Sequence, residues 1–454
     1  FHPTTKVVGT FSAVYRKYAK NNTLKTNGIK ENKNKLEYDF DFTCFSQSKL
    51  NSFVQCPKKY EFDILSPKEE QKHYLKGNLL HEFAEFYINY KEFVNEKGDE
   101  YFADIMLNEY LNMIENINKD LERTNFLIGV KNLKNYIDAL NIDESNMAQK
   151  TQTKDKNRSN HKNKNIFSEL LNKPLHKQNT EVYFEYSELG LKGIIDLIVN
   201  NSLIVDYKTS KETKTVGSIV KNANINLIKD TVDFQPMAYL SKLRLDEMRR
   251  SSLLEPEVQK ENPNKELHFH YYFIFNNKKD VINGEEDYES NIVKITYYPF
   301  TFNKYLLTDK CQNMLLDKGD RKKLLNYMSK KDLIEFLKSN PIIEEEQFNT
   351  NYEGTFFKKF LEFSKGFSNT KTIEKACNDY YKEVVNMRTG KSRNLKTALF
   401  FKEDIDKFEE FLEEQIQLIK TYIVNGFPKK PLSKKICEKC IYYDKCFKGI
   451  NHGE

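Results

Sequence analysis

Three charged residues interrupt two runs of sequence that are otherwise almost wholly apolar. Asp196 lies in residues 193–199, and Asp206 and Lys208 lie in residues 203–208. A charge buried among apolar residues costs free energy unless a partner compensates for it. Two carboxylates that converge at about 4 to 6 Å repel each other and favour a cation between them. Oxygen ligands of this kind suit Mg²⁺ or Mn²⁺. A lysine beside such a metal can orient or help to deprotonate a water.

The loop between the two runs decides whether Asp196 joins the other two residues. Asp206 and Lys208 are two residues apart, so their side chains share a face of a strand. In an antiparallel hairpin, a two-residue loop puts Asp196 on the opposite face. A three-residue loop pairs Val199 with Leu203 and sets Asp196 opposite Asp206. We therefore predict the three-residue loop, or a bulge with the same parity. The alternative is a surface salt bridge between Asp206 and Lys208, with Asp196 capping a turn.

The surrounding pattern predicts the sheet and the helices that must hold these residues. Apolar residues alternate with polar ones from residue 181, and two more strands are expected at 267–275 and 292–298. Helical spacing of apolar residues predicts helices near 77–90, 101–114 and 233–249, and mostly helix between 300 and 426. The fold class is therefore α/β, a mixed sheet flanked by helices.

Three of the seven cysteines have the spacing of metal or cluster ligands. Cys437, Cys440 and Cys446 follow the pattern C-x2-C-x5-C in a tail too short to bury thiols by packing. Three thiolates leave one ligand missing, and Cys56 is the candidate. Cys44, Cys311 and Cys377 have no such spacing and are interpreted as ordinary residues, as are His268 and His270 on a predicted strand.

Composition narrows the class of protein. The chain has 454 residues, of which 39% are hydrophobic and 30% charged, and its net charge is +6. So small an excess excludes a blanket cationic coat for nucleic acid. No apolar run is long enough to span a membrane, and no phosphate-binding P-loop is present. The cysteine usage and the absence of a signal peptide predict an intracellular, cytoplasmic location. A chain that begins with Phe1 is expected to be part of something longer.

The charged residues resemble the active-site core of the PD-(D/E)XK nuclease superfamily, and more narrowly its RecB-type branch. The residues that carry the resemblance are, in chain order, Gly77-x-x-x-His81-Glu82, Gly193-x-x-Asp196, Asp206-Tyr207-Lys208-Thr209 and Gln235-x-x-x-Tyr239. The resemblance implies metal ligation by His81, Asp196, Asp206 and the Tyr207 carbonyl, and catalysis by Lys208. It implies that Gln235 and Tyr239 position the DNA strand and the lysine. Pro236 directly after Gln235 departs from the pattern and puts the start of that helix in question.

The cysteines resemble a second feature of related nucleases. In AddB-type helicase-nuclease subunits and CRISPR adaptation nucleases, a Cys-Pro at the end of a helix is the first ligand of a [4Fe–4S] cluster. Three C-terminal cysteines complete that cluster, often after Gly-x-Phe-Pro-x-x-Pro. Here Cys56-Pro57 matches, and residues 426–431 (GFPKKP) come close. The resemblance implies an iron–sulfur clasp on Cys56, Cys437, Cys440 and Cys446, with zinc as the alternative metal.

Together these features predict one interrupted nuclease domain. We expect a basic tail or linker over residues 1–44, a core over 45–300 with a disordered insertion near 141–179, a helical insertion over 301–403, and a C-terminal helix with the cysteine cluster over 404–454. The expected function is a Mg²⁺- or Mn²⁺-dependent DNA nuclease, acting as an exonuclease on single-stranded ends with a helicase in DNA repair. The alternative is a non-catalytic DNA-binding or scaffolding subunit that keeps the fold.

Overall fold

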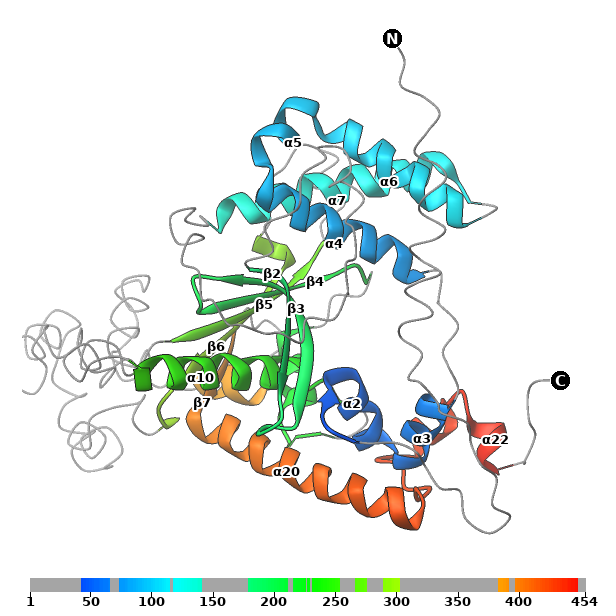
Figure 1. The fold of residues 1–454 in the computed structure, drawn as a ribbon, viewed down its shortest axis with the longest axis vertical. Helices are drawn as coiled ribbons and strands as arrows, with labels where there is room; N and C mark the ends of the chain where they lie inside the picture. The colour runs from blue at the N-terminus through cyan, green and yellow to red at the C-terminus, as the bar shows by residue number, and fades with distance from the viewer. Residues whose placement is uncertain are drawn as a thin grey trace, which may run out of the picture. The chain divides into compact units, whose positions relative to one another are not determined.

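The chain divides into two compact units by its internal contacts. Figure 1 labels the helices and strands of which these units are built. The computed structural model describes residues 42–65, 73–114, 117–140, 179–210, 215–225, 227–228, 231–253, 266–275, 289–302, 383–391 and 397–447. The first unit takes residues 1–45, 52–178 and 415–454, and the second takes 46–51 and 179–414. The helices α2 (Gln47–Gln55) and α20 (Lys402–Asn425) contribute residues to both.

A mixed sheet is the framework of the second unit. Its strands among the described residues are β1 (Phe45–Ser46), β2 (Thr180–Tyr186), β3 (Leu191–Val199), β4 (Leu203–Lys208), β5 (Leu267–Phe273), β6 (Ile292–Tyr298) and β7 (Thr397–Phe401). The strand order is β1-β3-β4-β5-β6-β7, and β2 also pairs with β3. β3 runs antiparallel to β2 and β4, β5 runs antiparallel to β6, and the pairs β4–β5 and β6–β7 are parallel.

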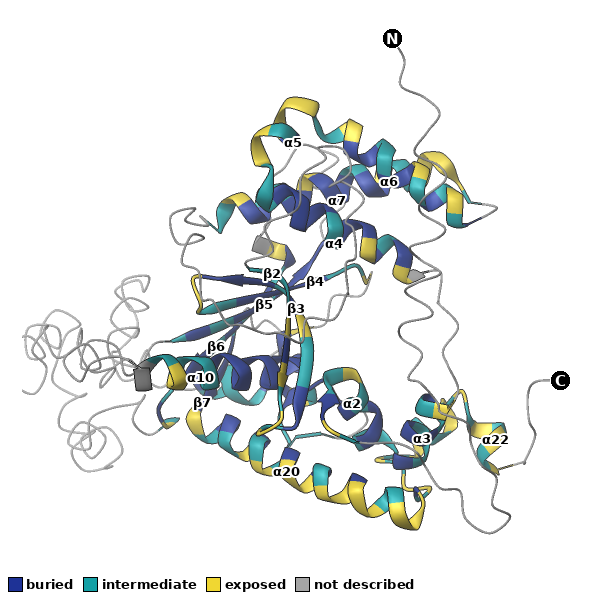
Figure 2. Ribbon diagram, viewed as in Figure 1, coloured by how far each residue is buried: buried dark blue, intermediate teal, exposed yellow. Residues whose placement is uncertain are grey.

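Aromatic and aliphatic side chains attach the helices of the second unit to the sheet. The helix α10 (Gln235–Leu253) places the Tyr239 ring 6.1 Å from the Phe269 ring of β5. Just before α10, the Phe234 ring lies 5.5 Å from Phe408 in the first half of α20. The short helix α9 (Val216–Ala223) begins at Thr215, whose hydroxyl accepts a hydrogen bond from the Ser218 N–H. Most strand residues are therefore buried (Figure 2).

Ion pairs connect α10 with the first half of α20. The Arg244 guanidinium lies 2.5 Å from Asp406 and 2.7 Å from Glu409. Arg244 is only 19% exposed, so water weakens these pairs less than it weakens pairs on an open surface. The carboxylates offset the loss of hydration of the guanidinium, and the two helices are thereby fixed over the same part of the sheet.

The expectation of mostly helix between residues 300 and 426 has an exception, because one described segment in this range is a strand. Thr397–Phe401 forms β7, which pairs in parallel with β6. The sequence TALFF has no polar side, and its residues 398–401 are buried, which is typical of a strand in the interior of a sheet. Residues 383–389 are helical, and Arg388 in this segment lies 3.0 Å from Asp404 at the start of α20. Residues 303–382 lie outside the described part of the chain.

Four helices form a bundle in the first unit: α4 (His73–Asn89), α5 (Lys91–Lys97), α6 (Asp99–Met113) and α7 (Lys119–Ala139). Aromatic rings fill its core, with Phe102 5.5 Å from Phe83 and 5.9 Å from Phe86. The α7 helix begins at Asn118, whose side chain accepts a hydrogen bond from the Leu121 N–H. Burial of these rings, at roughly 2 kcal/mol each, is the main stabilising term of the bundle.

The remaining described part of the first unit joins segments that are far apart in the sequence. It contains α3 (Pro57–Leu65), α21 (Lys434–Glu438) and α22 (Tyr443–Phe447). The Tyr60 ring lies 5.3 Å from Phe53 and 5.9 Å from Phe427, and Phe53 lies 6.0 Å from Tyr422. These aromatic contacts bring the end of α2 beside the end of α20.

The observed architecture is the expected mixed α/β fold with a sheet flanked by helices. The predicted helices near 77–90, 101–114 and 233–249 correspond to α4, α6 and α10. Residues 1–41 of the predicted tail (1–44) and residues 141–178 of the predicted insertion (141–179) lie outside the described part of the chain. None of the described helices combines the length and the apolar character that crossing a membrane requires.

Candidate metal centre and cysteine cluster

The β3–β4 hairpin carries both aspartates in the predicted register. Val199 pairs with Leu203, so the loop has three residues and this prediction is confirmed. Continued along the strands, the register sets Asp196 opposite Asp206. Asn200 and Asn201 in the loop are left-handed, with φ of 48° and 52°. Asparagine adopts this conformation more readily than most residues do, so the loop sequence suits the register.

Asp196 is oriented by the neighbouring strand. Its carboxylate accepts a hydrogen bond of 2.8 Å from the backbone N–H of Tyr207. Its negative charge contributes to the raised pKa values of Lys208 and Tyr239, as does the charge of Asp206. Both carboxylates therefore face the space in which the Lys208 ammonium lies.

Asp206, Lys208 and Gln235 form a closed group of contacts. The Lys208 Nζ atom lies 2.6 Å from Asp206 Oδ2 and donates a 3.0 Å hydrogen bond to Gln235 Oε1. The Gln235 Nε2 group donates to the other oxygen of Asp206. Asp206 is 5% exposed, so its charge is stabilised by these partners more than by water. The resemblance predicted that Gln235 positions the lysine, and the two side chains are in direct contact.

Residues that the sequence did not single out hold Gln235 in place. Asp233 caps the start of α10, because its Oδ1 atom accepts a 3.3 Å hydrogen bond from the Gln235 N–H. The Tyr271 hydroxyl lies 3.2 Å from Asp233 Oδ2 and 3.4 Å from Gln235 Oε1. Gln47 donates to Asp233 at 3.5 Å. Pro236 is tolerated because it lies in the first turn, where its missing N–H has no partner within the helix.

Tyr239 contacts the hairpin backbone. Its hydroxyl donates a 2.8 Å hydrogen bond to the carbonyl of Ile194 on β3. Burial raises the pKa of the Tyr239 phenol far above its ordinary value, and Asp206 and Asp196 raise it further. The hydroxyl therefore stays protonated and acts as a donor that fixes the segment before Asp196.

Lys208 keeps its positive charge at neutral pH. Burial by itself would lower its pKa, but the carboxylates of Asp206, Asp196 and Asp233 outweigh burial, and the pKa is raised. A charged ammonium close to two carboxylates suits the stabilisation of negative charge that develops in a phosphoryl-transfer transition state.

A third carboxylate lies at the same place. Glu181 on β2 brings a carboxylate oxygen within 4.8 Å of an Asp196 oxygen. Its φ angle is 49°, which is unusual for a residue inside a strand. In the sequence, Glu181 is only the first polar residue of a predicted strand in which apolar and polar residues alternate. Nothing in that pattern distinguishes it from Glu185, which lies further along the same strand.

The chemistry of these donors fits a hard divalent cation. Glu181, Asp196 and Asp206 offer oxygen ligands on neighbouring strands, and Mg²⁺ and Mn²⁺ prefer such ligands. The carboxylates of Asp206, Asp196 and Asp233 around one lysine leave an excess of negative charge, which a divalent cation would offset. The second unit therefore contains a possible acidic metal site.

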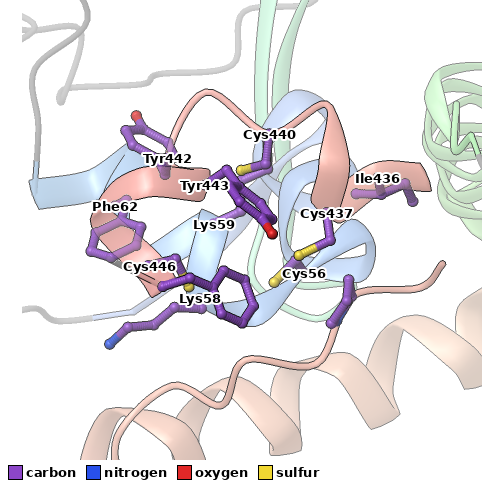
Figure 3. A pocket seen from close by; sticks show the side chains of 12 residues that line it. Cys56, Lys58, Lys59, Phe62, Ile436, Cys437, Cys440, Tyr442, Tyr443 and Cys446 are labelled. Carbon is purple, nitrogen blue, oxygen red and sulfur yellow. The ribbon is translucent and has the colours of Figure 1, made fainter. Parts of the chain in front are cut away.

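The structure also brings together the four cysteines with ligand spacing. Cys56 follows α2, Cys437 lies on α21, Cys440 follows it, and Cys446 lies on α22. All four line one pocket, together with Phe62, Tyr443 and other side chains (Figure 3). None of these four cysteines is in a disulfide, and their side chains are neither fully buried nor fully exposed.

Backbone and side-chain hydrogen bonds hold the tail against the end of α2. The Leu432 N–H donates to the Gln55 carbonyl at 2.8 Å, one residue before Cys56. The Tyr442 hydroxyl lies 3.1 Å from Asp63 Oδ1 on α3, and Ser52 on α2 donates to Asp63 Oδ2 at 2.5 Å. The chain therefore fixes the backbone near the thiols independently of any bound metal.

The thiols are close enough to influence one another's ionisation. Burial raises the pKa of Cys440, and the thiols of Cys56 and Cys437 raise it further, while Lys59 opposes the change. The pKa of Cys446 is raised by burial and by the same two thiols, with Lys429 opposing. Four mutually repelling thiolates are stabilised by a shared cation, so the donor set fits a thiolate-ligated metal or cluster.

Comparison with protein families agrees with this geometry. The chain matches the PD-(D/E)XK nuclease superfamily over residues 44–447. The chain belongs to this superfamily. No curated protein and no solved structure matches it.

Members of the PD-(D/E)XK superfamily are generally metal-dependent nucleases, and the match covers both the aspartate–lysine group and the cysteines. Of the residues predicted for the superfamily's active site, Asp196, Asp206, Lys208, Gln235 and Tyr239 come together in the second unit. His81 lies on α4 in the first unit, and its role as a ligand stays a prediction, as does that of the Tyr207 carbonyl.

Proposed function

We propose that the protein is a Mg²⁺- or Mn²⁺-dependent deoxyribonuclease of the RecB/AddB type. It hydrolyses phosphodiester bonds at single-stranded DNA ends. The observation that carries this proposal is the contact of Lys208 with both Asp206 and Gln235, on a hairpin whose register brings Asp196 to the same place. A structural salt bridge needs no second carboxylate. Metal-dependent hydrolysis of a phosphodiester, in contrast, needs acidic ligands for the metal and a nearby cationic side chain.

Each side chain has a role in the proposed reaction. A divalent cation supplies Lewis acidity and lowers the pKa of a water bound to it. Asp196 and Asp206 hold that cation, together with His81 and the Tyr207 carbonyl. Lys208 orients the attacking water and stabilises the negative charge that develops on the phosphate. Gln235 keeps the lysine beside Asp206, and Tyr239 fixes the hairpin backbone near Asp196.

The test of nuclease activity compares the wild-type protein with Asp206→Ala and Lys208→Ala. End-labelled single-stranded DNA is incubated with Mg²⁺ or Mn²⁺, and with EDTA as the metal-free control. We expect both variants to lose at least about 100-fold of the wild-type rate, since each loses a group that acts in the transition state. Lys221→Ala, on α9, is the matched control and should cleave normally. Equal activity in all four proteins would contradict the proposal and favour a non-catalytic DNA-binding role.

Circular single-stranded DNA distinguishes exonuclease from endonuclease action. An enzyme that requires ends should digest a linear strand and leave a circle of the same sequence intact. Digestion of the circle at a similar rate would contradict the proposal of an exonuclease, while leaving the metal-dependent chemistry in place.

We also propose that Cys56, Cys437, Cys440 and Cys446 hold a [4Fe–4S] cluster. The support is that four free thiols line one pocket and that a backbone hydrogen bond ties the tail to the end of α2. An anaerobically purified protein should be yellow-brown, with broad absorption near 400 nm and about four iron atoms per chain. A colourless protein that contains one zinc atom per chain would contradict this proposal and favour zinc.

The surroundings of the cysteines support single-stranded DNA as the substrate. The Tyr443 and Phe447 rings lie 5.1 Å apart and are 39% and 55% exposed. The Lys429 Nζ atom lies 5.2 Å from the Phe447 ring, and Lys445 Nζ lies 4.9 Å from the Phe62 ring. Exposed rings flanked by lysines are typical of surfaces that stack bases and bind the phosphate backbone.

Binding measurements without divalent cations test this surface. The double variant Tyr443→Ala/Phe447→Ala should bind a fluorescent single strand about 10-fold or more weakly, because stacking is worth roughly 1–3 kcal/mol per base. Tyr101→Ala removes a ring that is 40% exposed on α6 and should bind normally. Equal affinity of both variants and the wild type would contradict the role of this surface.

The proposed setting is DNA repair in a reducing intracellular compartment, with a helicase as a separate subunit or fused domain that supplies the single strand. The RecB/AddB-type motifs and the free cysteines support this setting. Co-purification of the natural full-length protein with an ATP-dependent unwinding activity is the corresponding test.

A further inference from the structure

Glu181 has a backbone conformation that its residue type does not favour. It lies inside β2 with a φ of 49°. In the left-handed region, the side chain of a residue other than glycine crowds the backbone, so this conformation costs free energy. Asn200 and Asn201 are also left-handed, but they lie in a hairpin loop, where such a conformation forms the turn. Glu181 has no turn to form.

The unusual backbone lies directly across from Asp196. On either side of Glu181, Thr180 pairs with Leu197 and Val182 pairs with Ile195. The register therefore sets Glu181 opposite Asp196, and oxygens of the two carboxylates lie within 4.8 Å of each other. Two like charges at this distance repel each other and favour a cation between them. Local strain and repulsion therefore occur together at a single place in the sheet.

The charge of Glu181 also reaches the residues around the hairpin. It contributes to the raised pKa values of both Tyr207 and Tyr239, although burial is the larger cause for each. Tyr207 precedes Lys208 and Tyr239 donates to the hairpin backbone. The carboxylate thus faces the space that Asp196 faces.

We propose that Glu181 is a further carboxylate ligand of the divalent cation. The inference rests on the proposed metal-dependent function and extends its ligand set by a residue from β2. A cation between Glu181 and Asp196 would turn their repulsion into attraction. Backbone strain that persists in a folded protein is typical of functional sites.

The first test measures Mn²⁺ binding to the full chain by isothermal titration calorimetry, without DNA. Glu181→Gln keeps the shape of the side chain and removes its charge, and we expect it to bind Mn²⁺ at least about 10-fold more weakly than the wild type. Glu185→Gln is the matched control, because Glu185 is an exposed glutamate on the same strand, and its affinity should not change. Wild-type affinity in Glu181→Gln would overturn the inference.

A second variant separates the ligand role from a structural one. Glu181→Gly removes the carboxylate and places at this position the residue that best adopts a positive φ. We expect its thermal midpoint to equal or exceed that of the wild type, while its Mn²⁺ affinity falls as in Glu181→Gln. A lower midpoint with unchanged Mn²⁺ affinity would overturn the inference, since Glu181 would then serve the fold.

These results are distinguishable from failure of the proposed function. If the wild type binds Mn²⁺ and cleaves DNA but Glu181→Gln binds equally well, only the inference fails. If binding depends on Glu181 but the wild type cleaves no DNA, the nuclease proposal fails and the ligand assignment stands. A wild type that binds no Mn²⁺ would overturn both.

Discussion

The Gln235 side chain forms hydrogen bonds with two charged partners of opposite sign. Its amide nitrogen donates to Asp206, and its amide oxygen accepts from Lys208. A carboxylate at this position would attract the lysine but repel the aspartate, and an ammonium would do the reverse. A neutral amide bonds both partners without adding a charge, so glutamine suits this position at the start of α10.

His270 on β5 should make the stability of the second unit depend on pH. Burial, together with smaller contributions from Lys294 and His268, lowers its pKa from 6.5 to about 3. The unfolded chain therefore binds a proton below pH 6.5, whereas the folded chain does so only near pH 3. Stability is full above pH 6.5 and falls as the pH drops, by about 2 kcal/mol between pH 7 and pH 5.

Urea unfolding of the wild type and His270→Gln at pH 7 and pH 5 measures this effect. Between pH 7 and pH 5, the free energy of unfolding of the variant should fall by about 2 kcal/mol less than that of the wild type. His268→Gln is the control, because the His268 side chain is 37% exposed and its variant should keep the wild-type pH dependence. If the free energy of unfolding changed by the same amount between pH 7 and pH 5 in the wild type and in His270→Gln, the prediction would be wrong.

At this scale the sequence revealed residues whose local surroundings were unusual. Asp196, Asp206 and Lys208 stood out because they are charged residues in apolar strands. Asp233, Tyr271 and Glu181 did not stand out. Tyr271 contacts residues 36 and 38 positions away in the sequence, and Glu181 is distinguished only by its backbone angle and its distance from Asp196. Neither property is visible in residue type or spacing.

At the scale of elements, the hairpin and α10 are in close contact because of one glycine. A Cβ atom added at Gly193 on β3 would lie 2.9 Å from the Phe184 ring and 3.4 Å from the Tyr239 ring. These two rings are themselves 5.9 Å apart in an edge-to-face arrangement. The glycine of the Gly-x-x-Asp motif thus lets α10 approach near enough for Tyr239 to bond the hairpin.

Gly193→Ala should therefore loosen this contact. We expect a loss of about 1–2 kcal/mol in the free energy of unfolding, because the added methyl displaces the Phe184 ring. Nuclease activity should fall by more than the stability loss explains, since Tyr239 positions the backbone before Asp196. Chemical denaturation and initial cleavage rates measure the two effects. The control is Gly98→Ala, where a Cβ meets nothing within 4 Å and only the positive φ of 81° opposes it.

A variant that folds with wild-type stability and cleaves at the wild-type rate would contradict the role of Gly193. Loss of stability alone, with normal activity in the folded fraction, would show that Tyr239 has no positioning effect.

Elements with clear periodicity were predictable. The hairpin register followed from the requirement that Asp196 and Asp206 lie on the same face of the sheet. The β7 strand was not predicted, because five residues within a long helical context carry too short a pattern. Only its pairing with β6, about 100 residues earlier in the chain, makes Thr397–Phe401 a strand. The order of strands in the sheet was likewise beyond reach, since it depends on these long-range pairings.

At the scale of the whole molecule, the cysteine cluster joins distant parts of the chain. Cys56 and Cys437 are 381 residues apart in the sequence. A bond between such distant positions removes much of the freedom of the unfolded chain, an effect on the order of 5 kcal/mol by loop-closure entropy. A cluster here would therefore act on stability even without any redox role.

Cys446→Ser should lower the stability of the first unit. We expect loss of the absorption near 400 nm, a thermal midpoint several degrees lower and faster hydrogen exchange in α3 and α22. The backbone contacts of Leu432 and Tyr442 should keep part of this region folded. Cys377→Ser is the control, because that cysteine lacks ligand spacing. An unchanged midpoint in Cys446→Ser would contradict a stabilising clasp.

The division of the first unit between two stretches of sequence has a consequence for protein synthesis. Its helix α3 is complete by residue 65, but α21 and α22, which line the same pocket, begin only at residue 434. At about 5–20 residues per second, a ribosome needs on the order of half a minute to make the intervening chain. During that time Tyr60 and Cys56 lack the contacts made by Phe427 and the three later cysteines. This part of the nascent chain therefore stays incomplete until late in synthesis, and the set of four thiols is complete only after residue 446 has left the ribosome.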